Sequence, residues 1–327
     1  MSSLLVILGP TGVGKTELSL CVAERYDAPI LSADSRQIYR DIPICSAAAT
    51  ESERARVRHF FVGTQSLDQT YSAAQFESDA MSLIESDGEA CHLLCGGSMM
   101  YLDAVCRGID DMPQADPAIR ARLKAQVEAE GLEPLLRQLE QLDPTYYAQV
   151  DRRNPQRVVH GLEMCLTTGQ PFSSFRTGRA KERPFRILKV GLTRPRPELY
   201  ERIAARVTDQ MVPQGLATET ERIYQRYAET LHVQLRDVVR NPGPTQTQPI
   251  PNLTPTSLNT VGLREMLLYY EGIYTWDRAI ERIVHNSRVY AKKQMTWFQR
   301  DSEIHWFHPS QQDEILTLCD QFLCCKT

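Results

Sequence analysis

Short apolar runs alternate with amphipathic stretches through the first third of the chain. These runs are bounded by turn residues, and they predict strands at residues 4–8, 29–33, 59–63 and 91–95. The run at 59–63 has the character of an edge strand. An amphipathic helix is predicted at residues 14–25, directly after the first strand. Strands that alternate with helices are typical of a parallel sheet, so we predict an α/β fold.

From about residue 116 the apolar spacing becomes helical. The predicted helices lie at residues 118–130, 132–142, 154–168, 197–214 and 217–231. A polar, arginine-rich segment at 173–186 precedes a strand at 187–192, which we expect to rejoin the sheet. We therefore predict a helical domain at residues 116–178, inserted into a core of residues 1–115 and 179–327 that ends in C-terminal helices.

Residues 241–257 combine proline with threonine, glutamine and asparagine, a composition that does not bury a core. We interpret this segment as a surface loop or linker. The alternative is a rigid proline-rich ligand for a partner domain.

The last helical segment is predicted at residues 276–300. Its apolar positions form one stripe: Ile280, Ile283, Val284, Ala291 and Phe298. Its basic positions lie on the far side or at the flank: Arg278, Arg282, Arg288, Lys292, Lys293 and Arg300. From periodicity alone, such a face is more often solvated than bound to nucleic acid.

Composition limits the class of protein. At 327 residues, the chain favours two compact units or one unit with a large insertion. Hydrophobic residues make up 42% and charged residues 24%, which is typical of globular proteins. The net charge of -4 gives no overall sign of nucleic-acid affinity, so any such contact must come from local basic patches.

The nine cysteines form no closely spaced pairs followed by histidines, so neither a zinc site nor a disulfide framework is predicted. The chain enters a strand within three residues of its start, and no apolar run reaches about 18 residues. We expect no signal segment, no membrane span and a cytoplasmic location.

The strongest chemical signal follows the first strand. Gly9-Pro10-Thr11-Gly12-Val13-Gly14-Lys15-Thr16 fits the phosphate-binding loop pattern G-x-x-x-x-G-K-[ST]. In such a loop, backbone amides surround phosphate oxygens, Lys15 neutralises charge and the Thr16 hydroxyl reaches Mg²⁺. The following helix directs its positive end at the same anion. The alternative is a turn that merely needs glycine, but a strand before and a helix after the motif favour phosphate binding.

Two other strands end in polar turns. Asp34-Ser35-Arg36-Gln37 follows the second strand, and Gly96-Gly97-Ser98 follows the strand at 91–95. Ligands of open parallel sheets bind beyond the carboxyl ends of the strands. Both turns are therefore expected near the phosphate loop.

The phosphate loop and these turns resemble, in order and spacing, the motifs of the tRNA dimethylallyltransferases. The other matching segments are SADSRQIY at 32–39, YSAAQF at 71–76, YL at 101–102, NPQR at 154–157, VGLR at 261–264 and AKKQMTW at 291–297. The resemblance runs from Leu4 to about Arg300. It implies a core like that of P-loop NTPases, with a loop shaped as in nucleotide-binding and ATP-binding proteins.

The resemblance also implies the reaction. A dimethylallyl group passes from dimethylallyl diphosphate to N6 of adenosine 37 in the tRNA anticodon loop, giving N6-isopentenyladenosine and diphosphate. Mg²⁺ is the implied cofactor, tRNA and dimethylallyl diphosphate are the implied partners, and a monomer is expected. The loop suits this substrate because it recognises only the diphosphate and magnesium that nucleotides also carry.

Catalytic roles follow by similarity. Because an exocyclic adenine amine is a poor nucleophile, a base must take its proton, and Asp34 matches the family's base. A helix N-cap or a magnesium ligand is the alternative role for Asp34. The family's groups that contact the diphosphate match Lys15, Thr11 and Arg206. Arg206 ends the segment ERIAAR at 201–206, in which Arg202 is the alternative candidate for the same contact.

Because a stacked base cannot reach an enclosed site, the adenine must be turned out of the anticodon loop. The resemblance implies RNA contacts from Asp34, Ser35, Arg36, Gln37, Ser98, Arg120, Gln156, Arg157, His160, Arg264, Lys292, Lys293 and Gln294.

The sequence departs from the family at three places, one of which is a proline-rich loop after Arg240 that is longer than usual. Ser98 stands where threonine is usual, and DIPICS at 41–46 replaces a glycine-rich stretch, with no lysine in 47–50. Three other activities remain as alternatives: a nucleotide or metabolite kinase, isopentenyl transfer to free adenosine phosphates, and RNA binding without catalysis.

Overall fold

The computed structural model describes residues 2–113, 115–240 and 250–325. It divides into two compact units, one of Met1–Cys106 with Arg183–Thr327 and one of Arg107–Glu182. The predicted bounds of the helical insertion were residues 116 and 178. Most of the predicted proline-rich loop, residues 241–249, lies outside the described residues.

The larger unit is built on a parallel sheet with strand order β3-β2-β4-β1-β5-β6. The strands are β1 (Ser2–Leu8), β2 (Ile30–Ala33), β3 (His59–Phe60), β4 (Cys91–Gly96), β5 (Phe185–Leu192) and β6 (Ile304–Phe307). The prediction that the strand after the helical unit rejoins the sheet is confirmed, because β5 pairs with β1. Leu8 lies opposite Gly96, and Gly96 lies opposite Ala33, so β1, β4 and β2 end at one edge.

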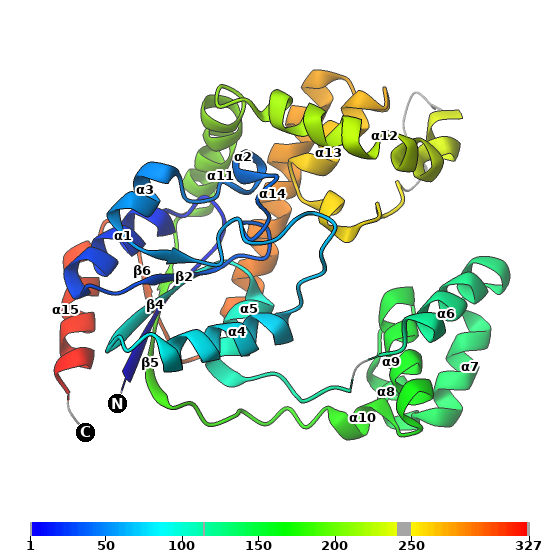
Figure 1. Cartoon of the computed structure of the whole chain (residues 1–327), viewed down its shortest axis with the longest axis horizontal. Coiled ribbons are helices and arrows are strands. Elements are labelled where there is room, and N and C mark those ends of the chain that lie inside the picture. Colours follow the sequence, from blue (N-terminus) through cyan, green and yellow to red (C-terminus); the bar gives the residue numbers. More distant parts are fainter. Residues whose placement is uncertain (1, 114, 241–249, 326–327) are drawn as a thin grey trace. The chain divides into compact units, whose positions relative to one another are not determined.

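Alternate residues of β1 enter two different cores, as a buried parallel strand requires. Leu4 and Val6 pack with α4 (Ala73–Ser86) and α5 (Met99–Arg107). Leu5 and Ile7 pack with α1 (Lys15–Tyr26) and α15 (Gln312–Cys324). The sheet is therefore covered by helices on both faces (Figure 1).

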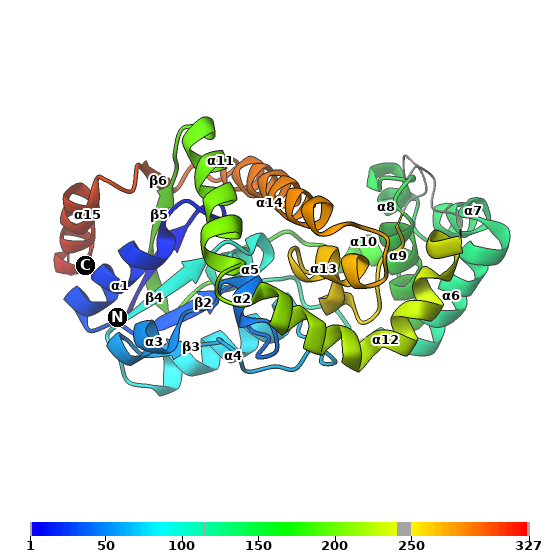
Figure 2. The ribbon, with the colours of Figure 1, turned by 90° about the horizontal axis from the view of Figure 1, so that it is seen from above.

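A third core lies outside the sheet. It joins α12 (Leu216–Arg240), α13 (Leu263–Tyr270) and α14 (Trp276–Phe298). Helix α11 (Arg196–Ala205) continues into a π-helical segment, Arg206–Met211, and lies beside α14 (Figure 2). The remaining elements of this unit are α2 (Pro43–Ser46), α3 (Glu51–Arg56) and a 3₁₀ turn, Thr256–Asn259.

The smaller unit is helical and has a core of its own. Its helices are α6 (Pro117–Glu130), α7 (Glu133–Leu142), α8 (Pro144–Gln149), α9 (Pro155–Thr168) and α10 (Phe172–Phe175). Asp116, Asp143 and Asn154 cap three of these helices by accepting backbone N–H bonds. The buried Asp143 also accepts two bonds from Ser173, which ties α10 to α8.

The prediction that the chain's last helix ends near residue 300 is wrong, because β6 and α15 follow α14. Helix α12 also extends to Arg240 rather than ending at residue 231. Strand β6 is short. Its start is anchored by Lys189 of β5, whose buried ammonium contacts Asp301 and Glu303 at 2.7 Å. Among the described residues, no helix combines the length and the apolar character that a membrane span requires.

One stability prediction concerns the chain's return from the helical unit. Arg183 contacts Glu77 at 2.7 Å, and both side chains are at least nine-tenths buried. Arg183→Met should lower the free energy of unfolding by about 3–5 kcal/mol, because it removes the guanidinium that pairs with a buried carboxylate. Chemical denaturation of the full chain measures this change.

The matched control is Arg278→Met, which breaks an exposed pair with Glu281. It should change the free energy of unfolding by less than about 1 kcal/mol. Equal effects of the two variants would contradict the prediction.

Candidate functional site

The loop between β1 and α1 has a backbone that only glycine fits at key positions. Gly12 adopts φ +79°, and a Cβ there would lie 2.9 Å from Cγ1 of Ile203. A Cβ on Gly9 would lie 2.7 Å from the carbonyl oxygen of Leu192. The loop is therefore pressed against the ends of β5 and α11, and its shape is set before any anion binds.

Lys15 folds back over this loop. Its Nζ donates to the carbonyl oxygens of Gly9 at 3.0 Å and Pro10 at 2.9 Å. Burial lowers the pKa of Lys15, although interactions with Cys95 and Asp34 act in the opposite direction. A phosphate beside this amine favours its charged form, which couples anion binding to protonation.

Arg206 reaches the same loop from the first residue of the π-helical segment. Its Nη1 donates to the Thr11 hydroxyl at 3.1 Å, and its Nη2 donates to the Ser46 carbonyl at 3.5 Å. Burial lowers the pKa of Arg206, and Asp34 opposes this shift. The rival Arg202 lies on the exposed side, where its Nε donates to the Gly12 carbonyl at 3.0 Å.

Asp34 lies beyond the end of β2 and closes its own turn. Its Oδ1 accepts from the backbone N–H of Arg36 at 2.8 Å and of Gln37 at 3.4 Å. Because its charge acts on both Lys15 and Arg206, the three groups belong to one electrostatic site. The structure thus brings the predicted carboxylate and the two predicted cations together.

Gln294 of α14 connects the phosphate loop to the turn after β4. Its Oε1 accepts from the Thr11 N–H at 2.9 Å, and its Nε2 donates to the Gly97 carbonyl at 2.8 Å. The side chain is only 2% exposed. Gln294 was predicted to contact RNA, but in the structure both ends of its amide bond within the protein.

Ser98 has a similar internal role. Its hydroxyl accepts from the Ser35 N–H at 2.8 Å and also bonds to the Ser35 hydroxyl. Gln37 likewise bonds internally, to the Ser32 hydroxyl and the Ala47 carbonyl. The turns after β1, β2 and β4 are therefore fastened to one another by buried polar side chains.

Other predicted RNA contacts have different surroundings. Arg264 donates to the carbonyls of Ile250 and Pro251, so it supports the segment before the 3₁₀ turn. Lys292 and Lys293 are exposed on α14.

In the helical unit, Gln156, Arg157 and His160 are exposed on α9. Arg120 bonds to the buried Glu163 at 2.8 Å, and His160 lies 3.7 Å from the same carboxylate oxygen. Three of these exposed polar groups thus lie on α9, and Arg120 of α6 is joined to α9 through Glu163.

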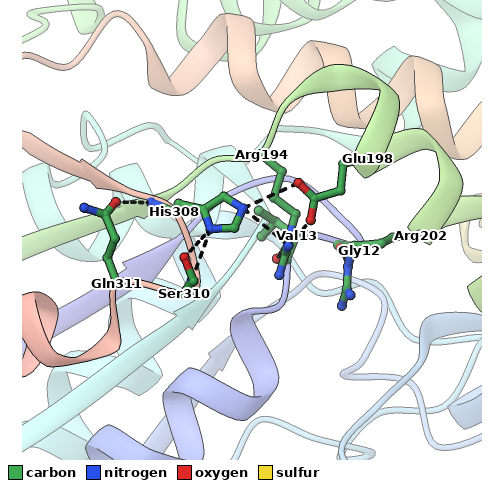
Figure 3. Close-up of polar contacts among 8 residues, drawn as sticks. All are labelled: Gly12, Val13, Arg194, Glu198, Arg202, His308, Ser310 and Gln311. Carbon is green, nitrogen blue, oxygen red and sulfur yellow. Dashed lines mark hydrogen bonds and ion pairs between the residues drawn. The ribbon is translucent and has the colours of Figure 1, made fainter.

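Several groups near the site were not predicted. Tyr290 is on α14, and burial, together with the charge of Asp34, raises its pKa to about 12. Arg194 donates from Nε to the Val13 carbonyl at 2.7 Å and contacts Glu198 and His308 (Figure 3). The basic segment RPR at 194–196 offered only a weak signal, because nothing in the sequence relates it to His308.

Comparisons with known proteins agree with this arrangement. The model of the IPP transferase family matches residues 37–301. The tRNA dimethylallyltransferase 2 of Parabacteroides distasonis is 51% identical over 98% of this chain and 99% of its own length. The tRNA dimethylallyltransferase 1 of Bacteroides fragilis is 49% identical, with 96% of both chains covered.

Two solved structures are also similar. The tRNA isopentenylpyrophosphate transferase of Bacillus halodurans matches with a TM-score of 0.66 and 30% identity, covering 99% of this chain and 97% of that one. A eukaryotic dimethylallyltransferase acting on tRNA matches with a TM-score of 0.80 and 22% identity, covering 100% of this chain and 81% of that one. The second similarity concerns the fold alone.

The geometry of Gln294 generates a prediction. Gln294→Leu removes an acceptor from the Thr11 N–H and a donor from the Gly97 carbonyl, so it should loosen the phosphate loop. Affinity for inorganic diphosphate with Mg²⁺ should fall by about 5- to 100-fold, the range expected for a buried group left unpaired. Calorimetry measures this affinity.

The control is Thr296→Val, at an exposed position on the same helix. A direct RNA contact predicts the opposite pattern, in which diphosphate affinity is kept and only tRNA affinity falls. That result would contradict the structural role.

Proposed function

This chain belongs to the IPP transferase family, and we propose that it transfers a dimethylallyl group from dimethylallyl diphosphate to N6 of adenosine 37 in tRNA. The observation that carries the proposal is the convergence of Asp34, Lys15, Arg206 and Thr11 at the mouth of the phosphate loop. One carboxylate faces two cations there. Such a set suits an amine that must lose a proton and a leaving group that gains charge.

Asp34 is proposed as the general base. As the bond between N6 and the allylic carbon forms, the amine proton passes to the carboxylate. The two amide bonds to Oδ1 fix the orientation of the group and leave Oδ2 as the proton acceptor. An internal hydrogen bond of this kind holds the base in place before substrate arrives.

Lys15, Arg206 and Thr11 are proposed to bind the departing diphosphate. The carbon–oxygen bond breaks with its electron pair on oxygen, so negative charge grows at the diphosphate. Arg206 already orients the Thr11 hydroxyl at 3.1 Å, and Lys15 lies over the same loop. Because both cations are largely buried, their interaction with this charge is stronger than it would be in water.

Thr16 is the residue proposed to hold Mg²⁺. It lies in the first turn of α1 with an exposed side chain, beside Lys15. A single hydroxyl fits Mg²⁺, which takes most of its ligands from water and substrate phosphates. When bound, the ion would neutralise charge on the diphosphate oxygens.

RNA binding is assigned to exposed groups at two places. On α14 these are Lys292 and Lys293, and on the helical unit they are Arg120, Gln156, Arg157 and His160. Local cations of this kind let a protein of net charge -4 bind RNA phosphates. We propose a monomer that acts in the cytoplasm, where tRNA is the accessible substrate.

The deciding experiment separates this function from its alternatives. The protein, Mg²⁺ and dimethylallyl diphosphate are incubated with unmodified tRNA or with AMP or ATP, and the products are identified by mass. We expect a dimethylallyl adduct on tRNA alone. Adducts on free nucleotides would support a cytokinin-type activity, and phosphate transfer to a small molecule would support a kinase.

Asp34→Asn tests the base. Asparagine keeps the size and the turn-closing acceptor but does not accept the amine proton at neutral pH. The single-turnover rate should fall by about 10² to 10⁴, while tRNA and diphosphate still bind. Rapid quench with labelled substrate measures the rate.

A magnesium titration of the same variant distinguishes the competing role. If Asp34 were a magnesium ligand, diphosphate affinity would fall and added Mg²⁺ would restore most of the rate. Recovery of the rate by added Mg²⁺ would exclude the role of Asp34 as general base.

Removing charge at Lys292 and Lys293 tests the RNA surface. Replacing both with glutamine should weaken tRNA binding and flatten its dependence on salt by up to about 1.5 logarithmic units per decade, the share of two phosphate contacts. Diphosphate affinity should be unchanged. Arg278→Gln, on the same helix but paired with Glu281, is the control. If the double variant kept the wild-type salt dependence of tRNA binding, Lys292 and Lys293 would be solvent-exposed residues without an RNA contact.

A further inference from the structure

Two arginines on the outer side of the phosphate loop donate hydrogen bonds to the carbonyl oxygens of two consecutive loop residues. Arg202 donates from Nε to the Gly12 carbonyl at 3.0 Å, and Arg194 donates from Nε to the Val13 carbonyl at 2.7 Å. Figure 3 shows both guanidinium groups approaching the loop backbone. Neither contact depends on the loop's side chains, so both act on the conformation of the backbone itself.

The Arg194 contact fixes a particular peptide group. The carbonyl of Val13 and the N–H of Gly14 belong to one planar trans peptide, in which they point in opposite directions. Since the carbonyl points at Arg194, the Gly14 N–H points away from it. In a phosphate loop the amides at the start of the helix are the groups that bind the anion.

The peptide before Gly14 is restrained by its hydrogen bond to Arg194 rather than by Gly14 itself. Gly14 adopts φ +110°, a conformation that costs glycine little and permits a flip to other states. A Cβ on Gly14 would be in ordinary van der Waals contact with Nη2 of Arg194 at 3.5 Å and with the ring of Pro309 at 3.7 Å. Arg194 therefore restricts a backbone that glycine alone leaves permissive.

Arg194 is itself held by groups from two elements. Glu198, one turn later in α11, accepts from its Nη1. His308, just after β6, lies 3.4 Å from the same Nη1 and 3.5 Å from Glu198. His308 is fixed in turn by Ser310 and Gln311, at 2.7 and 2.8 Å (Figure 3).

We propose that Arg194 is a positioning residue for diphosphate binding, which keeps the Gly14 amide directed at the anion. His308 positions Arg194, and it acts on the Gly14 amide only through that arginine. The segment after β6 thereby contributes to the site, although it lies beyond residues 37–301, which the family model matches. This inference rests on the proposed function for the identity of its substrate.

The test compares Arg194→Met with wild type in the full chain. We expect the KM for dimethylallyl diphosphate and the Kd for inorganic diphosphate with Mg²⁺ to rise by about 10-fold or more, as for loss of one charged hydrogen bond. The KM for tRNA should stay within about twofold, because RNA binds to other groups. Arg194→Lys, which keeps one donor, should recover part of the diphosphate affinity.

The matched control is Arg196→Met, two residues further on. Arg196 is exposed and bonds to the Tyr200 hydroxyl rather than to the loop. Its loss should leave both KM values unchanged. If the two variants were equivalent, or if Arg194→Met raised the KM for tRNA as much as that for diphosphate, the positioning role would be overturned.

A double-mutant cycle tests the role of His308. His308→Ala alone should raise the Kd for inorganic diphosphate by about threefold, and it should add nothing in the Arg194→Met background. Independent, additive effects would overturn the statement that His308 acts through Arg194. Because this binding measurement needs no turnover, it remains informative even if wild-type protein fails to modify tRNA, and the two proposals can fail separately.

Discussion

The site depends on one buried amide, that of Gln294, which joins three segments far apart in the sequence. It links α14 to the Thr11 N–H of the phosphate loop and to the Gly97 carbonyl after β4. It extends the connection between β1 and β4 beyond their strand pairing, which stops at Leu8 and Gly96. A hydrogen-bonded amide is also more directional than an apolar contact, so it fixes the two turns relative to each other as well as packing them together.

Electrostatics then determines what this fixed frame can bind. Lys15 and Arg206 are positioned where burial disfavours their charged forms, and Asp34 compensates only in part. If a diphosphate binds here as proposed, it supplies the missing negative charge, and its binding and the protonation of the two cations favour each other. In the proposed reaction the leaving diphosphate gains charge, so the same two cations would stabilise it most at that moment.

The sequence predicted the elements whose periodicity is long or whose flanks are clear, such as β1, α1, β4 and α9, to within one or two residues. It failed at β6 and α15, because β6 is held by the distant Lys189 and not by local preference. Asp34, Lys15, Thr11 and Arg206 could be proposed from the sequence because they belong to motifs, and their catalytic roles stay predictions. Gln294 was given an RNA role although its spacing from Ala291 and Phe298 places it on the buried stripe, where a polar residue signals an internal hydrogen bond. Arg194 and His308 meet only through folding, so no local pattern relates them.

The segment that departs from the family pattern, at 41–46, still serves the site by another physical route. It forms α2, and the buried Glu219 of α12 accepts from the N–H groups of Ile44 and Cys45 at 2.8 Å. Burial raises the pKa of Glu219 while these amides oppose the shift, so the carboxylate and the start of α2 support each other. The other end of α2 presents the Ser46 carbonyl to Arg206 and is followed by the Ala47 carbonyl, which accepts from Gln37. The short helix α2 is thus anchored on a carboxylate, and both Arg206 and Gln37 donate hydrogen bonds to carbonyls at its end.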